Sequence, residues 1–168
     1  MAETRHGADV DRSDEWESMR RRHLRPAGER APNTARGVHH TALISTEVER
    51  TIDFYQGLLG FPLTELFENR DYRGSTHFFF DIGNGNTLAF FDFPGLDLPP
   101  YAEVLGGHHH LAISVEPEQW TVLRDRLAAA GVAVHEVHGV SMYFTGPDGE
   151  RIELLSDPLG EMYGQSVV

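Results

Sequence analysis

Two stretches of this sequence begin alike, and each opens with a histidine followed mainly by apolar residues. The first reads His40-Thr41-Ala42-Leu43-Ile44-Ser45, the second reads His110-Leu111-Ala112-Ile113-Ser114-Val115, and their starts lie 70 residues apart. After each come apolar residues at helical spacing, a glycine (Gly60 or Gly131) and further runs typical of strands. A chain in which one unit occurs twice is predicted to fold as two copies of a small module.

The first copy is predicted to form a strand, a helix and three more strands. Helical spacing places Ile52, Tyr55 and Leu59 on one face, and Gly60 ends the helix. Asn84-Gly85 is typical of the tight turn of a hairpin. The expected ranges are a strand at 38–45, a helix at 48–59 and strands at 61–67, 75–82 and 87–93.

The second copy is predicted to repeat that order. Trp120, Leu123 and Leu127 share one helical face, and Gly131 follows the helix. The turn residues Pro147-Asp148-Gly149 join the last two strands. The expected ranges are a strand at 109–115, a helix at 118–130 and strands at 132–137, 141–145 and 151–155.

The parts outside the two copies read as appendages and a connection. Residues 1–36 are predicted to form an N-terminal arm with a short helix, for which Ser13 supplies the N-cap. Proline and glycine make residues 94–106 a linker without regular structure. The expected organisation is an arm at 1–36, a domain at 37–158 with module one at about 37–93 and module two at about 107–158, and a tail at 159–168.

Composition excludes several kinds of chemistry. The absence of cysteine excludes disulfides, thiolate metal ligands and cysteine nucleophiles, and the absence of lysine excludes a Schiff base. Without cysteine a cytoplasmic location is favoured. Residues 37–168 carry 6 arginines against 19 acidic residues, which makes nucleic acid a poor partner. No apolar run approaches the length of about 18 residues typical of a membrane span, and the first residues lack the apolar segment of a secretory signal.

Three side chains at matching places in the two copies form a candidate metal site. Strand alternation places His40 on one face of the first strand and His110 on the same face of its counterpart. Glu153 lies on the last strand of the second copy, on the side opposite Ile152 and Leu154. Two histidines and one carboxylate on one side of an ion are typical of non-haem Fe(II) sites, and Mn(II), Zn(II) or Ni(II) would also accept these ligands.

The fold expected from this pattern is α+β, with two βαβββ modules related by pseudo-twofold symmetry and paired sheets enclosing a metal cleft. The counterpart of Glu153 in the first copy is Ala89, so a fourth protein ligand is missing. An open position favours a catalytic over a closed structural metal site. The alternative, in which each histidine is a hydrogen-bonded core residue and Glu153 faces solvent, stays open from the residues alone.

With these motifs the chain resembles the vicinal oxygen chelate superfamily, which includes glyoxalase I, extradiol dioxygenases, fosfomycin-resistance enzymes and bleomycin-binding proteins. The resemblance covers about residues 37–158. The residues that carry it are His40-Thr41-Ala42-Leu43, Thr51-Ile52-Asp53-Phe54-Tyr55, Leu59-Gly60-Phe61, His110-Leu111-Ala112, Tyr143-Phe144 and Gly146-Pro147-Asp148-Gly149-Glu150-Arg151-Ile152-Glu153-Leu154.

The resemblance implies roles for further residues. Glyoxalase I carries a glutamate where Ala89 stands, whereas extradiol dioxygenases use His, His and Glu at the positions of His40, His110 and Glu153. The tyrosine of those dioxygenases matches Tyr143, which would bond a metal-bound substrate oxygen. Asn86 stands where they carry a histidine, and an amide donates hydrogen bonds but is no general base. His77 is the candidate substitute for that histidine.

The favoured function is therefore a metal-dependent enzyme most like an extradiol-type dioxygenase. The resemblance implies a small-molecule substrate with two adjacent oxygens, a divalent metal with Fe(II) first, and a homodimer. An aromatic or bulky apolar substrate follows from strand faces that can line an apolar pocket, although several of their phenylalanines must belong to the core; these residues are Phe78, Phe80, Phe90, Phe91 and Phe93. The alternatives are a glyoxalase-like isomerase, epimerase or lyase that uses the ion as a Lewis acid, and a non-catalytic protein that binds a drug or metabolite.

Overall fold

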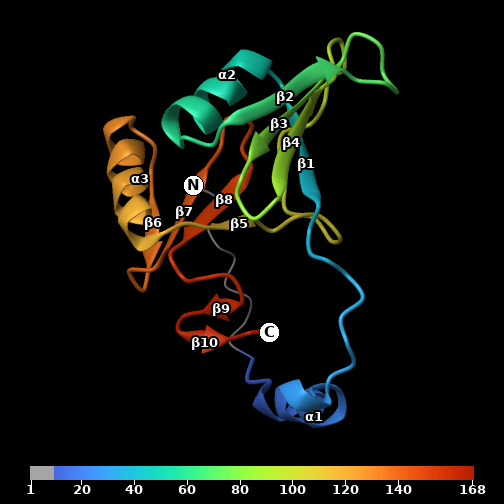
Figure 1. Cartoon of the computed structure of the whole chain (residues 1–168), viewed down its shortest axis with the longest axis vertical. Coiled ribbons are helices and arrows are strands. Elements are labelled where there is room, and N and C mark those ends of the chain that lie inside the picture. The colour runs from blue at the N-terminus through green and yellow to red at the C-terminus, as the bar shows by residue number, and fades with distance from the viewer. Residues whose placement is uncertain (1–9) are drawn as a thin grey trace. The chain divides into compact units, whose positions relative to one another are not determined.

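A computed structural model describes residues 10–168, which divide into a unit that ends at Arg36 and a second unit, Gly37–Val168. The first unit holds the helix α1 (Ser13–His23) and the short 3₁₀-helix η1 (Ala27–Glu29) (Figure 1). The prediction that Ser13 caps α1 is wrong, because Ser13 is its first helical residue. Arg12 is the N-cap residue, and the carboxylate of Asp11 before it accepts a hydrogen bond of 2.9 Å from the Ser13 N–H.

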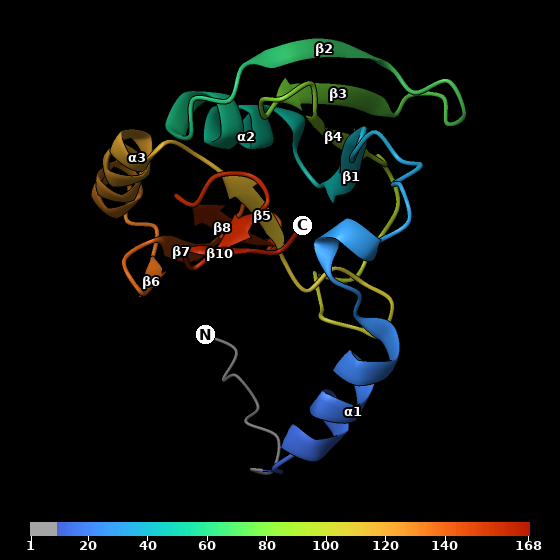
Figure 2. The ribbon, with the colours of Figure 1, turned by 60° about the horizontal axis from the view of Figure 1, so that its bottom comes forward.

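The second unit is built on two four-stranded sheets of the same topology (Figures 1 and 2). The first has the order β1-β4-β3-β2 and the second the order β5-β8-β7-β6. In each, the first and last strands of the module pair in parallel and the other neighbours are antiparallel. The strands are β1 (His40–Ser45), β2 (Leu63–Glu68), β3 (Thr76–Asp81), β4 (Thr87–Asp92), β5 (Leu111–Ser114), β6 (His135–Val137), β7 (Ser141–Thr145) and β8 (Arg151–Leu155). The α+β fold with two βαβββ modules is thus confirmed.

One helix accompanies each sheet. In the first module α2 (Val48–Ile52) continues directly as a π-helix, η2 (Asp53–Leu58), and in the second α3 (Pro117–Ala129) begins with proline in its first turn. Both helices stop before a glycine with a positive φ, 77° at Gly60 and 76° at Gly131. A residue with a Cβ is strained there, which explains why the same residue type ends both helices.

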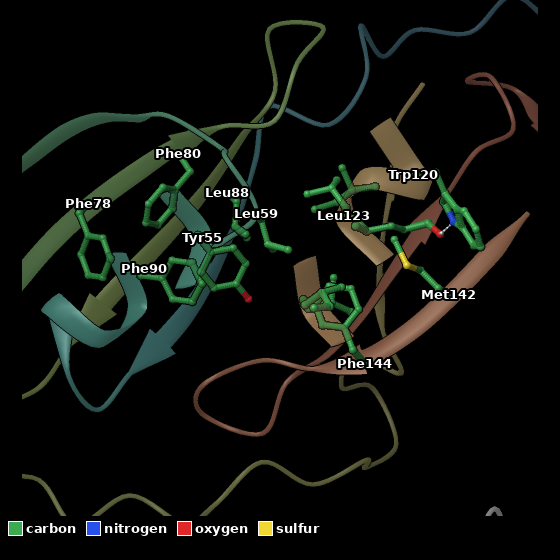
Figure 3. Close-up of a cluster of buried hydrophobic side chains, with 14 residues drawn as sticks. Tyr55, Leu59, Phe78, Phe80, Leu88, Phe90, Trp120, Leu123, Met142 and Phe144 are labelled. Carbon is green, nitrogen blue, oxygen red and sulfur yellow. Dashed lines mark hydrogen bonds between the residues drawn. The ribbon is translucent and has the colours of Figure 1, made fainter. Parts of the chain in front are cut away.

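The buried core lies on the helix side of both sheets (Figure 3). Tyr55 and Leu59 of the first module and Trp120, Leu123 and Leu127 of the second are buried there, as their helical spacing predicted. The sequence left open which of the five phenylalanines line a pocket and which belong to the core. The side chains of Phe78, Phe80 and Phe90 are fully buried core residues.

The two modules of one chain join through this core. The phenol of Tyr55 donates a hydrogen bond of 2.7 Å to the buried carboxylate of Glu150, and the rings of Phe54 and Phe144 lie 6.1 Å apart. At the edge of the joint Arg50 forms an ion pair of 2.7 Å with Asp148. Burial raises the pKa of Glu150 above its usual value, so Glu150 ionises at a cost that its hydrogen bonds offset only in part.

The opposite face of each sheet carries no helix, and we call these the first and second open faces. Strand register gives each face its members. The first open face holds His40, Ala42, Ile44, Glu65, Phe67, His77, Phe79, Asp81, Thr87, Ala89 and Phe91. The second open face holds His110, Ala112, Ser114, His135, Ser141, Tyr143, Arg151 and Glu153.

Near the end of the chain the structure departs from the sequence prediction again. Residues 159–168 contain a small antiparallel hairpin of β9 (Glu161–Met162) and β10 (Gln165–Ser166), a segment for which no regular structure was predicted. Tyr163 lies in the turn of this hairpin, and its ring contacts that of His138 at a centroid distance of 5.3 Å. No helix among residues 10–168 has the length and apolar character to cross a membrane.

Candidate metal centre

Two of the three predicted ligands lie in contact on the second open face. The Nε2 atom of His110 lies 2.9 Å from Oε2 of Glu153. Parallel pairing of β5 with β8 produces this contact, because it sets Ala112 opposite Glu153 and His110 directly precedes β5. Antiparallel pairing of β7 with β8 sets Tyr143 opposite Glu153 on the other side.

Neutral donors surround the Glu153 carboxylate. Its side chain is 2 % exposed, and the hydroxyl of Ser141 donates a short hydrogen bond to its Oε1 atom. Burial and hydrogen bonding to Glu153 raise the pKa of Tyr143 to about 12, so its phenol stays protonated and serves as a donor. Arg151, the arginine of the second open face, is ion-paired with Glu103 at 3.2 Å. Glu153 therefore has hydrogen bonds but no arginine partner.

His40, the third predicted ligand, lies on the other sheet. Its ring contacts Phe79 at a centroid distance of 6.3 Å, and its Nδ1 atom lies 2.9 Å from Nδ1 of His39. Among residues 10–168 of a single chain, no three histidine or acidic side chains gather closely enough to hold a metal ion. One chain thus brings together His110 and Glu153 but not His40.

The first open face is mainly aromatic. His77 stacks on Phe91 with ring centroids 3.8 Å apart, and the rings of Phe67 and Phe79 also contact it. The Nε2 atom of His77 is buried and has no hydrogen-bond partner among the described residues. Burial, followed by the nearby charge of His40, lowers the pKa of His77, so its ring is neutral at pH 7.

Each histidine of the predicted ligand pair has a histidine neighbour that the sequence reasoning did not use. His109 contacts His110 through their Nδ1 atoms at 2.7 Å, just as His39 contacts His40. The doublets His39-His40 and His109-His110 were the available signal, because both occur at the same place in the repeat. Ser141 was missed for another reason, since only the strand register shows that its side chain faces Glu153.

Asn86 lies in the turn between β3 and β4, where its backbone pairs with Gly83 and Ile82. Strand register makes it the counterpart of Glu150, three residues before Ala89 as Glu150 is three before Glu153. In the described part of the chain its side chain forms no hydrogen bond with another candidate residue. A role for Asn86 in catalysis stays a prediction.

The hollow beside His110 is small in a single chain. Tyr101, His110, Arg151 and Leu43 border it, and it has a volume of about 10 Å³. That is close to the least space that holds one water molecule and far below what a substrate needs. A substrate site at these residues therefore requires a further wall.

A family model described as the Glyoxalase/Bleomycin resistance protein/Dioxygenase superfamily matches residues 37–154. Among curated proteins, the chain is 27 % identical over 120 residues to the glutathione transferase FosA of Serratia marcescens, covering 70 % of this chain and 78 % of that protein. It is 23 % identical over 140 residues to MhqA of Bacillus subtilis (strain 168), whose name assigns it provisionally to the ring-cleaving dioxygenases. That match covers 78 % of this chain and 43 % of MhqA.

The fold also matches a solved fosfomycin resistance protein, a point mutant of FosX from Listeria monocytogenes. Its structure contains Mn(II) and 1S,2S-dihydroxypropylphosphonic acid. The TM-score is 0.55 at 22 % identity, and the match covers 74 % of this chain and 94 % of that one. At this identity the likeness supports the fold alone.

Proposed function

The chain belongs to the Glyoxalase/Bleomycin resistance protein/Dioxygenase superfamily, and on that premise we propose that it is a metal-dependent enzyme acting on a small molecule with two adjacent oxygens. Within that class the proposed reaction is an extradiol-type dioxygenation of an aromatic or bulky apolar substrate. The proposed ligands are His40, His110 and Glu153, with Fe(II) as the first candidate ion and Mn(II), Zn(II) or Ni(II) as alternatives.

The observation that carries this proposal is the contact between His110 and Glu153. A buried carboxylate that faces an open sheet face costs free energy unless a positive charge compensates it. Ser141 and Tyr143 supply only neutral donors, and Arg151 is engaged by Glu103. The donor set of one imidazole nitrogen and one carboxylate thus fits a divalent cation, which would supply the missing charge.

The third ligand is proposed to come from a second copy of the chain. The two modules of one chain join through their helix sides, so within residues 37–168 no helix covers either open face. The first open face offers His40 and the second offers His110 and Glu153. In a dimer with a twofold axis, the first open face of each copy packs against the second open face of the other copy. Each of these two contacts then completes one set of three ligands.

The residues around the ion would divide the remaining work. When bound, a divalent ion stabilises the deprotonated form of a chelating substrate hydroxyl. The protonated phenol of Tyr143 donates a hydrogen bond to a substrate oxygen beside Glu153. His77 is neutral and its Nε2 atom has no partner among residues 10–168, so it offers one hydrogen bond to substrate among Phe67, Phe79 and Phe91.

This aromatic setting is the reason for proposing an apolar substrate. Of the residues that define the two open faces, Arg151 is the single arginine, and Glu103 already neutralises it. A strongly anionic substrate would find little compensating charge there. A planar ring, in contrast, packs well between aromatic side chains.

The function is tested by oxygen uptake. The full chain, purified without oxygen and reconstituted with Fe(II), is expected to consume oxygen with a panel of catechols in an oxygen electrode. Glu153→Ala is expected to abolish oxygen uptake, and Tyr143→Phe is expected to slow it. The full chain is also assayed under argon with Mn(II) or Zn(II) in place of iron. If it then turns over a substrate with adjacent oxygens, the Lewis-acid reaction replaces dioxygenation as the proposed function. Tight ligand binding without turnover under any of these conditions would contradict both.

The origin of His40 is tested by mixing two inactive variants. In a dimer of one His40→Ala chain and one Glu153→Ala chain, one of the two sites has all three ligands only if His40 crosses between copies. Random mixing of equal amounts after co-expression is then expected to restore about a quarter of all metal sites. If each chain builds its own site, mixing restores none.

The Lewis-acid reaction is a second candidate because one observation favours it. Asn86 cannot act as the general base that a histidine supplies, and it lies in a turn rather than on an open face. A relative of this fold is known with Mn(II) and a diol phosphonate, a ligand with adjacent oxygens. Isomerisation, epimerisation or addition at a chelated substrate would use the same three ligands without oxygen.

A further inference from the structure

A hydrogen-bonded chain runs from Arg151 through two histidines to Glu153. The guanidinium Nη1 atom of Arg151 lies 3.4 Å from Nε2 of His109. Nδ1 of His109 lies 2.7 Å from Nδ1 of His110, and Nε2 of His110 lies 2.9 Å from Oε2 of Glu153. Each contact joins the next, so the position of one proton fixes the others.

Hydrogen-bonding chemistry assigns those protons in this structure. An arginine only donates, so Nε2 of His109 is the acceptor and the proton of a neutral His109 is on Nδ1. That Nδ1–H donates to His110, whose own proton is therefore on Nε2, where it bonds Glu153. In this arrangement the nitrogen of His110 that faces Glu153 is protonated and is closed to a metal.

A second arrangement is available because Nε2 of His109 has two different neighbours. The carboxylate of Glu103 lies 4.0 Å from that nitrogen and is itself paired with Arg151 at 3.2 Å. If the proton of His110 is on Nδ1, it donates to His109, and the proton of His109 is then on Nε2, facing Glu103. This leaves Nε2 of His110 free to bind an ion.

We infer that His109 is a positioning residue that, with Glu103 and Arg151, switches the ring tautomer of His110 between a metal-free and a metal-bound form. The inference rests on the proposed metal site at His110 and Glu153. In the switch Nε2 of His110 releases one proton to solvent and Nε2 of the exposed His109 takes one proton from solvent, while the proton between the two Nδ1 atoms moves from His109 to His110. Both rings stay neutral, and the pair holds two protons before and after.

The inference separates His109 from its neighbour His108. Both side chains are exposed, but within residues 10–168 only His109 has ring contacts with His110, Arg151 and Glu103. Carboxylate partners of ligand histidines orient the ring and raise its basicity, and their loss costs about 10- to 100-fold in metal affinity. Here the histidine His109 stands between the carboxylate and the ligand.

The tautomers are read directly by long-range proton–nitrogen NMR of the full chain with ¹⁵N-labelled histidine, using Zn(II) as a diamagnetic probe. Without metal, His109 is expected to carry its proton on Nδ1, which is the minor tautomer of free histidine. Saturating zinc is expected to move that proton to Nε2 and the proton of His110 to Nδ1. A His109 proton on Nε2 in the metal-free protein, or no change with zinc, overturns the inference.

Zinc affinity, measured by competition with a chromogenic chelator, gives the second readout. His109→Phe is expected to weaken zinc binding about tenfold or more, whereas His109→Asn keeps an acceptor for His110 and stays within about threefold of the parent chain. His108→Phe is the matched control and is expected to bind zinc as the parent chain does. Equal affinities for His109→Phe and His108→Phe overturn the inference.

The two readouts distinguish this inference from the proposed function. If the parent chain takes up no zinc, the proposed metal site fails. The protonation of His109 in the metal-free protein still decides whether the chain of hydrogen bonds exists. A zinc-binding protein with His109 protonated on Nε2 throughout keeps the proposed function and loses the switch.

Discussion

The two sheets of the second unit share one topology, yet their open faces carry different chemistry. Strand register pairs the positions of the faces: Ala42 lies beside Ala89 where Ala112 lies beside Glu153, and Phe79 stands where Tyr143 does. His40 and His110 are the histidines that match. The first face is mainly aromatic and carries the exposed carboxylates Glu65 and Asp81, whereas the second holds the buried carboxylate Glu153, the phenol of Tyr143 and Arg151.

This difference shows how a duplicated module divides the work of a site. The backbone positions are set twice by the same strand pairing, so a ligand at one position has a ready counterpart at the other. Only one copy keeps the carboxylate, because Ala89 stands where the other copy has Glu153. The other copy is then free to supply apolar contacts for the substrate.

The largest expected effect comes from making the second face like the first at its central position. Glu153→Ala introduces the residue found at Ala89 and removes the one anionic residue among the proposed ligands. Zinc affinity is expected to fall about 100-fold or more, which corresponds to about 2.7 kcal/mol. Chelator competition measures the affinity, with the exposed carboxylate variant Glu161→Ala as control. Unchanged zinc binding by a folded Glu153→Ala protein would move the metal site elsewhere.

The sequence alone predicted most of the fold because its signals are local and repeated. Helical spacing and the stop glycines Gly60 and Gly131 located both helices, and period-two runs located the eight strands of the two sheets. The hairpin β9–β10 was missed because its strands of two residues are too short to show a period. Ser13 failed as a cap because it is the first residue of the helix and its hydroxyl donates a hydrogen bond to Asp11.

The site was harder to predict than the fold. Alternation placed His110 and Glu153 on one face, and the structure puts them in contact. Which phenylalanines face the core was not predictable, since the run 78–80 is apolar on both sides of the strand. The position of His40 relative to His110 depends on how modules pair, and no local pattern records that choice.

The joint between the modules gives the second prediction, because the two modules contribute different residues to it at matching positions. Tyr55 bonds Glu150 across the joint, whereas the counterpart of Glu150 is Asn86, which has no such bond in the described part of the chain. Tyr55→Phe leaves a buried carboxylate short of one donor and is expected to lower the free energy of unfolding by about 1–3 kcal/mol. Chemical denaturation measures it, with the exposed Tyr72→Phe as control. Equal stability of the two variants would show that Glu150 finds another donor.

The pH dependence of stability tests the same difference between Glu150, which titrates, and its counterpart Asn86, which does not. Burial raises the folded-state pKa of Glu150 above its unfolded value of about 4.5. A raised pKa means that the folded state binds the extra proton, so this stabilising contribution is complete below about pH 4.5 and is lost as the pH rises through the folded-state pKa. Glu150→Gln, which does not titrate, is expected to remove that decline.

The measurement is the difference in unfolding free energy between the parent chain and Glu150→Gln, followed from pH 4 upward. The parent chain is expected to lose stability relative to the variant as the pH rises, and the exposed variant Glu161→Gln is expected to show no such trend. A difference that grows in favour of the parent chain with rising pH would mean that the hydrogen bonds from Tyr55 and Asp148 outweigh burial.

The smallest expected effect compares the two histidine doublets. His39 contacts His40 through Nδ1 at 2.9 Å, as His109 contacts His110. In the described structure, however, Glu103 and Arg151 flank only His109, whereas the exposed ring of His39 contacts no charged side chain there. An unsupported exposed histidine orients its neighbour weakly, because solvent replaces its hydrogen bond at little cost.

His39→Phe is therefore expected to weaken zinc binding by less than about threefold, against about tenfold or more for His109→Phe. If both changes weaken zinc equally, the doublet itself and not its flanking charges orients the ligand, and Glu103→Gln should then leave zinc affinity unchanged.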